Sequence, residues 1–420
     1  MKTVKFYTLG CKANQYDTQL IREQFINAGF RELDNHKLAD VYLINTCTVT
    51  HRADADSLNF IRKARRENPK AKVVVTGCLT ELDAERIKKI RGLCLIIKNR
   101  DKEKILSRLL HLQARATKKG ISYFQGHTRA FVKIQDGCDN FCSYCKVPFV
   151  RGNSKSKQKN EIVKEAQRLV KNGFKEIVLS GICLGAYGGD LKQKIGLVDI
   201  VEALERIDGL LRIRLSSIEA GDITDELIDK LSKSKKLCRH LHIPIQSGDD
   251  EILKRMNRGY ARSDYINLIK KIRKKMPQIA ITTDCLIGFP GETEENFQNT
   301  VSLIKEILPL KVHIFPYSRR GGTAASYFKQ ELSQQIIRKR INCLKEIAGV
   351  CALKYEERFL QKKMNVLVEE PSKDGFNTWE GLTDNYLKVL IKSGSDLKNQ
   401  LVRVKLEKIV KDALLGEIIY

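Results

Sequence analysis

Short β-branched segments alternate with helical segments along most of this chain, and this alternation limits the possible folds more than any other feature. Near the N-terminus, the apolar runs 41–47 and 72–78 are separated by a stretch of helical period at 53–66. Strands that alternate with helices predict a parallel sheet with both faces covered. We therefore expect a first α/β unit. Its expected strands are 5–10, 41–47, 72–78 and 93–98, and its expected helices are 17–28, 53–66 and 82–90.

A second strand and helix series follows a polar, basic segment at 99–129, which we interpret as a helix and a linker. This series has fewer units than the eight that close a full barrel, so it predicts a partial (β/α)6 barrel. The functional residues of such a barrel are expected at the carboxyl ends of its strands. The expected strands are 130–135, 176–181, 211–217, 240–246, 280–289 and 311–318.

The pattern changes after a basic helical stretch at 332–358. From residue 362 onward, short strands follow one another without helices, which predicts a small antiparallel β-barrel of the OB-like kind. Such barrels often bind nucleic acid, although a folding or dimerisation module would have the same pattern. The candidate contacts on its basic face are Tyr386, Lys388, Arg403 and Lys405. The expected domains are 1–110, a linker at 111–129, 130–358 and 359–420.

Three cysteines lie close together in the segment QDGCDNFCSYCKVP, and we name Cys138, Cys142 and Cys145 the loop triad. A CxxxCxxC run offers three thiolates from one loop, which suits three corners of a cubane iron–sulfur cluster. The fourth iron then has no protein ligand, and an open coordination position is typical of a catalytic metal. Zinc would favour two Cys pairs or a Cys/His set. A zinc knuckle or three incidental core cysteines are the alternatives.

A second group of cysteines follows the first three expected strands, and we name Cys11, Cys47 and Cys78 the strand-end triad. Because parallel strands end at the same edge of a sheet, these thiols should converge although they are far apart in the sequence. Ordinary packing is the alternative, since free cysteine is among the most buried residue types. The repetition at three successive strands favours a second cluster site.

Composition narrows the class of protein and of partner. Lys and Arg number 76 against 50 acidic residues, a net charge of +26, and nine basic residues fall within 146–175. This charge predicts a polyanionic partner such as nucleic acid, although lysine-rich codon usage would also raise it. No apolar run reaches the ~18–20 residues of a membrane span. The 12 cysteines without a signal peptide indicate a reducing compartment, so we expect a cytoplasmic protein.

Several motifs together resemble one enzyme family. The loop GCDNFCSYC, with Tyr144 before its last cysteine, resembles the signature of radical S-adenosylmethionine (SAM) enzymes. The segments TLGCKAN, INTCTVT, VTGC, HIPIQSG, GFPGETEE, HIFPYSRRGGT and GLTDNYLKV extend the resemblance, in order, to the methylthiotransferase family of that superfamily. The resemblance implies an N-terminal methylthiotransferase domain, a radical SAM partial barrel and a C-terminal TRAM domain that grips RNA. It also implies two 4Fe–4S clusters, one on each triad, and SAM.

Within the family, GCKAN and HIPIQSG most resemble the bacterial branch that modifies N6-threonylcarbamoyladenosine beside the anticodon of tRNA. The implied reaction replaces the hydrogen on adenine C2 with a methylthio group. General acid–base catalysis cannot form this C–S bond, because the C2–H bond has neither an acidic proton nor a leaving group, whereas a 5′-deoxyadenosyl radical can abstract the hydrogen. The branches that act on isopentenyladenosine or on a ribosomal aspartate are less similar.

The resemblance, together with the places of polar residues just past the expected strands, predicts particular contacts. The SAM contacts are predicted at Tyr144, Gly181, Ser217, Glu219 and Gln246, and the substrate contacts at Arg319, Arg320 and Arg151. Arg319 or Arg320 could pair with the carboxylate of the threonylcarbamoyl group, although phosphate contact or surface charge would explain either arginine equally well. We predict no role for Cys183.

Two other classes of function are compatible with parts of the pattern. A non-enzymatic iron–sulfur, RNA-binding protein or electron carrier would use four thiolates per cluster. A radical SAM enzyme that inserts sulfur into a small molecule would not need a basic C-terminal barrel. The partners implied by the favoured interpretation are tRNA and an electron donor such as flavodoxin or ferredoxin, and the expected state is a monomer.

Overall fold

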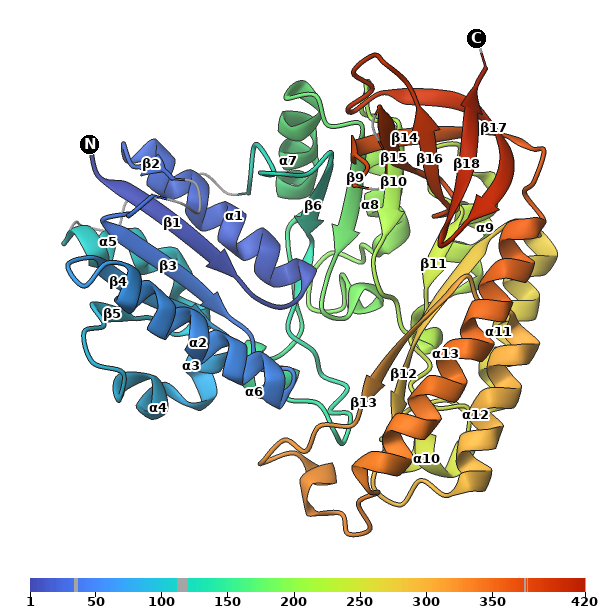
Figure 1. Ribbon diagram of the computed structural model, residues 1–420, viewed down its shortest axis with the longest axis horizontal. Helices are drawn as coiled ribbons and strands as arrows, with labels where there is room; N and C mark the ends of the chain where they lie inside the picture. Colours follow the sequence, from blue (N-terminus) through green and yellow to red (C-terminus); the bar gives the residue numbers. More distant parts are fainter. Residues whose placement is uncertain (34–36, 112–119, 374, 376, 420) are drawn as a thin grey trace.

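The computed structural model describes residues 1–33, 37–111, 120–373, 375 and 377–419 (Figure 1). Three sheet systems follow one another along the chain: a parallel sheet, a partial barrel and a small closed barrel. Residues 112–119 of the predicted linker lie outside the described part, and the domain boundaries stay predictions. None of the helices in the described part of the chain combines the length and the apolar character that a membrane span needs.

The first unit is the expected parallel sheet, with the strand order β2-β1-β3-β4-β5. Successive residues of β3 face opposite sides: Tyr42 belongs to a core with residues of α2, whereas Leu43 belongs to a core with residues of α1. Both faces are therefore covered. The elements are β1 (Thr3–Thr8), α1 (Lys12–Asn27), β2 (Arg31–Glu32), β3 (Val41–Thr46), α2 (His51–Glu67), β4 (Lys72–Gly77), α3 (Leu79–Leu82), α4 (Ala84–Lys88), β5 (Leu95–Ile96), the 3-10 helix η1 (Asn99–Lys104) and α5 (Ile105–Leu110).

The local pattern is wrong in two places in this unit. The helix expected at 82–90 is the shorter α4, which begins only after Asp83, because Asp83 leaves the helical conformation and its side chain caps α4 by accepting a hydrogen bond from the Arg86 backbone N–H; the additional turn α3 precedes it. The strand expected at 93–98 pairs only over the two residues of β5, at the sheet edge.

The second unit is the expected partial barrel. Two parallel sheets, β6-β9-β10 and β11-β12-β13, are joined by the bridges Ile213–Leu237 and Ser217–His242. The main elements are β6 (Arg129–Lys133), β7 (Gln135–Asp136), α6 (Val147–Arg151), β8 (Lys155–Ser156), α7 (Lys159–Lys171), β9 (Glu176–Ser180), α8 (Leu197–Glu205), β10 (Arg212–Leu215), α9 (Asp225–Lys233), β11 (His240–His242), α10 (Asp250–Arg255), α11 (Arg262–Lys275), β12 (Ala280–Ile287), α12 (Glu294–Ile307), β13 (Lys311–Pro316) and α13 (Gln334–Glu357). Short 3-10 helices lie at η2 (Leu184–Ala186), η3 (Ala220–Asp222) and η4 (Ala324–Tyr327).

The third unit is the expected small barrel, closed in the order β14-β15-β16-β18-β17. One pair, β16 with β18, is parallel, so the barrel is mostly rather than wholly antiparallel. The barrel packs on the amino ends of the central strands (Figure 1), where Arg212 and Arg214 donate hydrogen bonds to its backbone carbonyls. Its strands are β14 (Lys363–Pro371), β15 (Thr378–Thr383), β16 (Lys388–Lys392), β17 (Leu401–Val410) and β18 (Ala413–Ile418).

Candidate active site

The loop triad lies in the segment that follows β7 at the carboxyl end of β6. The backbone N–H of Cys138 donates to the carbonyl of Gly152, and the N–H of Ser143 donates to the carbonyl of Met256, both at about 3 Å. The Asn257 side chain donates to the carbonyl of Phe141 at 3.1 Å. The loop is therefore held by the residue after α6 and by the segment after α10. All three thiols are half-buried.

The surroundings give the three thiols of the loop triad different acidities. Burial raises the pKa of Cys145 to about 12. A hydrogen bond with the Cys183 thiol lowers the pKa of Cys138 to about 7. Burial raises the pKa of Cys142, which the Arg258 guanidinium at 3.5 Å from its Sγ partly offsets. Cys138 is therefore the thiol of the three that ionises most easily. This matters because iron binds the thiolate and not the thiol.

A cavity of about 390 Å³ opens beside the loop triad, lined in part by Cys142, Glu219 and Arg258. Its volume lies within the range of small-molecule sites. Arg258 is 4 % exposed and pairs with Glu219, which is 25 % exposed, so a cation and a carboxylate stand at the cavity wall. Three soft donors beside a polar cavity fit a cluster with one open iron, and the cavity charges fit a zwitterionic ligand such as the methionyl end of SAM.

The cysteines of the strand-end triad follow β1, β3 and β4 at the carboxyl edge of the first sheet, and Cys11 and Cys78 are close enough to act electrostatically on Cys47. An added Cβ on Gly10, whose φ is +95°, would lie 2.7 Å from the Sγ of Cys47. Gly77 precedes Cys78 and has a φ of +99°, and an added Cβ there would lie 2.4 Å from the backbone N and O of Thr46 on β3. Only glycine allows both approaches, because a Cβ would collide and the left-handed conformation would strain other residues.

Asn14, on the first turn of α1, connects the strand ends that carry this triad. Its side-chain amide donates to the carbonyl of Leu9 at 2.7 Å and to the carbonyl of Thr46 at 3.0 Å. Burial raises the pKa of Cys47 to about 11. Cys47 and Cys78 are buried, whereas Cys11 is exposed. The thiols thus fit a cluster that is closed toward the sheet and open on the Cys11 side.

Helix α6 links the two triads. It begins two residues after Cys145 and ends at Arg151, whose side chain is 1 % exposed. Arg151 donates to the Oδ1 of Asn14 at 2.5 Å and to the Oδ1 of Asp136 at 2.7 Å, and it pairs with Asp17 at 3.3 Å. The charges of Arg151 also act on Cys78, where they partly offset the effect of burial on its pKa. The loop triad is therefore tied to the wall of the strand-end triad by a buried ion network.

The five predicted SAM contacts all lie near the carboxyl edge of the barrel, but their binding role stays a prediction. Glu219 lines the cavity beside the loop triad. Tyr144 packs on an apolar cluster that includes Met256 and Phe289. A Cβ on Gly181 would lie 2.9 Å from the Gln135 side chain. The remaining two form isolated bridges, Ser217 with His242 and Gln246 with Cys285.

The three predicted substrate arginines have protein partners of their own. Arg320 is 6 % exposed and pairs with Asp54 of the first unit at 2.7 Å. Arg319 donates to the carbonyl of Ser326 and pairs with Glu331, yet its side chain is 57 % exposed. With Arg151 buried in the network above, these contacts favour a positioning role for Arg151 and Arg320 and leave Arg319 the most accessible of the three.

The sequence did not indicate two residues beside the loop triad. Arg258 comes from the segment MNRGY after α10, where no motif points to a thiolate partner. Cys183, for which no role was predicted, lies against Cys138 and 3.5 Å from the Oδ2 of Asp222. The C-terminal candidate Tyr386 also differs from the expectation, because its ring stacks on His240 at 4.4 Å between the two barrels instead of facing outward.

Comparisons with known proteins agree with this arrangement. A family model described as the radical SAM superfamily matches residues 132–304, and one described as uncharacterized protein family UPF0004 matches residues 3–98. Threonylcarbamoyladenosine tRNA methylthiotransferase MtaB of Bacillus subtilis is 40 % identical over 97 % of this chain and 94 % of its own length. The protein of the same name from Chlamydia pneumoniae is 36 % identical over 99 % of this chain and 98 % of its own.

A relative with another substrate in its name is somewhat less similar. The tRNA-2-methylthio-N(6)-dimethylallyladenosine synthase of Clostridium tetani is 34 % identical over 98 % of this chain and 95 % of its own length. Given these full-length matches, the chain belongs to the methylthiotransferase family of radical SAM enzymes. Membership implies a 4Fe–4S cluster and SAM as cofactors.

Solved structures share the fold at low identity. The radical S-adenosylmethionine methyltransferase TsrM of Kitasatospora setae is 14 % identical, with a TM-score of 0.56 over 77 % of this chain and 76 % of that chain. The cobalamin-dependent radical enzyme OxsB is 13 % identical, with a TM-score of 0.53 over 83 % of this chain and 56 % of that chain. Most of this chain therefore shares its fold with these two solved structures.

Proposed function

We propose that this protein is the methylthiotransferase that converts N6-threonylcarbamoyladenosine, beside the anticodon of tRNA, to its 2-methylthio derivative. The observation that carries the proposal is the pair of cysteine triads at two sheet edges, joined by α6, in a chain with full-length relatives of that name. The C2–H bond of adenine requires hydrogen abstraction, and a second sulfur-binding centre nearby supplies what a single radical cluster lacks.

In this proposal each triad holds one 4Fe–4S cluster. When bound, the loop-triad cluster and SAM supply the 5′-deoxyadenosyl radical, and the strand-end cluster supplies the methylated sulfur. Arg258 and Glu219 orient the zwitterionic end of SAM in the cavity beside Cys142. Arg151 and Asn14 keep α6 against the strand ends, so that the two centres face the same substrate atom. The electrons come from a one-electron donor of the flavodoxin or ferredoxin class.

The partners follow from charge and chemistry. A net charge of +26 suits tRNA, and the half-exposed or exposed basic residues of β17 give the C-terminal barrel phosphate contacts. Tyr386 is excluded from that surface because it packs between the barrels. We further propose a monomer that acts in the cytoplasm, where tRNA and reduced electron donors are present.

The alternative substrate is isopentenyladenosine in tRNA, which the name of the Clostridium tetani relative favours. The chain is 40 % identical to the Bacillus subtilis relative and 34 % identical to the Clostridium tetani relative, which favours threonylcarbamoyladenosine. The two substrates differ in polarity, because only the threonylcarbamoyl group carries a carboxylate and a hydroxyl. The wall of the pocket must therefore differ as well.

The test is nucleoside mass spectrometry of tRNA from a deletion strain, the same strain with this gene restored, and the same strain with a gene in which Cys142 is alanine. The proposal predicts that 2-methylthio-threonylcarbamoyladenosine is lost in the deletion strain, returns with the wild-type gene and does not return with the variant. Loss of the 2-methylthio form of isopentenyladenosine instead would transfer the proposal to the alternative substrate. No change in either nucleoside would contradict both.

A further inference from the structure

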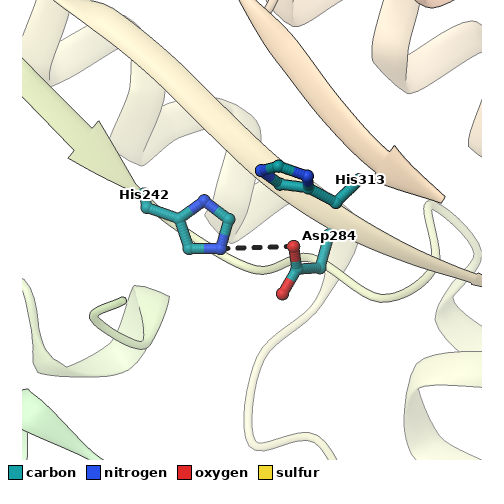
Figure 2. Close-up of side chains that lie close together, drawn as sticks. All are labelled: His242, Asp284 and His313. Atoms are coloured by element: carbon teal, nitrogen blue, oxygen red, sulfur yellow. Dashed lines mark ion pairs between the residues drawn. The ribbon is translucent and has the colours of Figure 1, made fainter. Parts of the chain in front are cut away.

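Three polar side chains that belong to neither triad lie together on the inner face of the second half of the barrel. Figure 2 shows His242, Asp284 and His313 pointing toward one another. Asp284 and His313 are direct partners in the pairing of β12 with β13, so they share one face of the sheet. The Nε2 of His242 lies 3.2 Å from the Oδ1 of Asp284. Nitrogen or oxygen atoms of all three lie within 4.8 Å of one another.

This face differs from the other face of the same strands. The alternating residues Thr283 and Cys285 are fully buried beneath the helices, whereas the three polar residues remain half-buried. Thr282 holds the Nδ1 of His242 at 2.8 Å, which fixes the ring and leaves its other nitrogen toward Asp284. Buried polar groups normally form hydrogen bonds within the protein. These three side chains are only half-buried and are held in place, so they can also form hydrogen bonds with a ligand.

Lys12, the first residue of α1 in the first unit, lies close enough to this group to interact with it electrostatically. It follows Cys11 of the strand-end triad, and its Nζ lies 6.0 Å from the centre of the Phe131 ring on β6. Its charge acts on both Asp284 and His313. A lysine that directly follows Cys11 and lies at Phe131 of β6 is therefore within electrostatic reach of the polar group.

Along the barrel strands, this group lies at nearly the same level as two of the predicted SAM contacts. Ser217 is level with His242, and Gln246 is level with Cys285, one residue beyond Asp284. One residue corresponds to about 3.3 Å along a strand. The group is thus within about one residue of the predicted SAM contacts along the strands, and it lies on β11, β12 and β13 rather than in the lining of the cavity beside Cys142 and Arg258.

We propose that Lys12, His242, Asp284 and His313 form the subsite for the polar N6 substituent of the target adenosine, with Lys12 binding its carboxylate. The His242–Asp284 pair and His313 then accept and donate hydrogen bonds to the hydroxyl and the carbamoyl group. This inference rests on the function proposed above and names the residues that select the substrate. Burial lowers the pKa of His313, so its neutral ring can accept as well as donate a hydrogen bond. An isopentenyl group would leave these polar atoms unpaired, which opposes its binding.

The test uses the full-length protein, reconstituted anaerobically with iron and sulfide, and tRNA carrying either threonylcarbamoyladenosine or isopentenyladenosine. The variants are Lys12→Met, Asp284→Asn and His313→Leu, with Lys345→Met on the exposed face of α13 and His111→Gln at the exposed end of α5 as matched controls. We expect each subsite variant to lose at least about 10-fold in kcat/KM for the threonylcarbamoyl substrate, mainly through KM. The controls should match the wild type.

Three readouts separate this role from a structural one. The KM for SAM, the 5′-deoxyadenosine formed with SAM and dithionite, and the iron content should all be unchanged in the variants. An unchanged kcat/KM in all three variants, or a raised KM for SAM, would overturn the proposal. One equivalent of a divalent metal other than iron, lost in His313→Leu, would also overturn it and make the group a metal site. If the wild type itself modifies only isopentenyladenosine, the function proposed above fails, independently of the variants.

Discussion

The two cysteine triads reach similar donor sets by opposite routes. The loop triad comes from one short segment, so its spacing is visible in the sequence and its position depends on a few backbone hydrogen bonds such as that from Ser143. The strand-end triad comes from three strands and exists only when the first sheet has formed. The comparison teaches that, in the proposed function, the radical centre is encoded locally whereas the sulfur centre depends on the fold of a whole sheet. Mutations should therefore separate the two centres.

The largest expected effect is at the loop triad. Replacing Cys142 by alanine should reduce 5′-deoxyadenosine formation to background, because two thiolates do not hold a reactive cluster beside the cavity. Anaerobic reconstitution, followed by chromatography of the products with SAM and dithionite, measures this. Cys94→Ser is the matched control, since Cys94 is exposed and outside both triads. Normal SAM cleavage by Cys142→Ala would remove the loop triad from the radical chemistry.

The next effect sharpens the comparison at the strand-end triad. Gly10→Ala places a Cβ 2.7 Å from the Sγ of Cys47 and strains a φ of +95°. We expect lower iron content and a loss of methylthiolation of about 10-fold or more, with SAM cleavage retained. Gly29→Ala is the matched control, because its φ of +83° carries a similar strain with no atom within 4 Å of the new Cβ. Equal activity losses in both variants would assign the effect to backbone strain alone.

A mutation remote from both triads should lower the stability of the whole protein and so favour neither triad. Glu176 is fully buried between Arg214 and Arg129 at the amino ends of the barrel strands, where Arg214 also bonds the C-terminal barrel. Glu176→Gln should destabilise the protein by about 3–5 kcal/mol, since it leaves buried cations unpaired. Urea unfolding measures this, and Glu202→Gln, at a surface pair with Lys230, should change stability by less than ~1 kcal/mol.

The same carboxylate predicts a pH dependence. Burial alone would raise the pKa of Glu176, but Arg214 and Arg129 hold it below its ordinary value of 4.5. Its contribution to stability is therefore present above about pH 4.5 and is lost as the pH falls through the lower folded-state pKa. The unfolding free energy of the wild type should fall in that range more steeply than that of Glu176→Gln. Parallel curves for the two proteins would contradict this role.

The smallest effect separates RNA binding from the chemistry of either triad. Arg403 is exposed on β17, and Arg403→Ala should weaken tRNA binding and reduce the slope of log K against log salt by roughly 0.7–0.9, which corresponds to one phosphate contact. SAM cleavage without tRNA should not change. Lys345→Ala on α13 serves as the control. An unchanged slope for Arg403→Ala would assign the C-terminal barrel another surface or another task.

Local patterns predicted the elements well where the sequence carries its own signal. The strands of the two α/β units are β-branched runs, and the cysteines at their ends were placed correctly because parallel strands end together. The pattern missed what depends on neighbours distant in the sequence. Asp83 caps α4 and so shortens the expected helix at its start, and β18 closes the small barrel beside β16, which makes that pair parallel.

The site residues show the same limit more strongly. Arg320 follows the sixth barrel strand as predicted, but its partner Asp54 is on α2 of the first unit, and no periodicity in the sequence indicates that contact. Arg258 and Cys183 reach the loop triad from two different segments after β11 and β9. Such contacts follow from how the units pack together, which local sequence patterns do not encode.

The most direct test of the two-centre account compares SAM cleavage with sulfur transfer in one strand-end variant. Cys47→Ala, reconstituted anaerobically and supplied with SAM, dithionite and tRNA carrying threonylcarbamoyladenosine, isolates the second centre because Cys47 is buried at the first sheet, outside the loop triad. The account predicts 5′-deoxyadenosine at a rate near that of the wild type and no 2-methylthio nucleoside. Methylthiolation at the wild-type rate would contradict it.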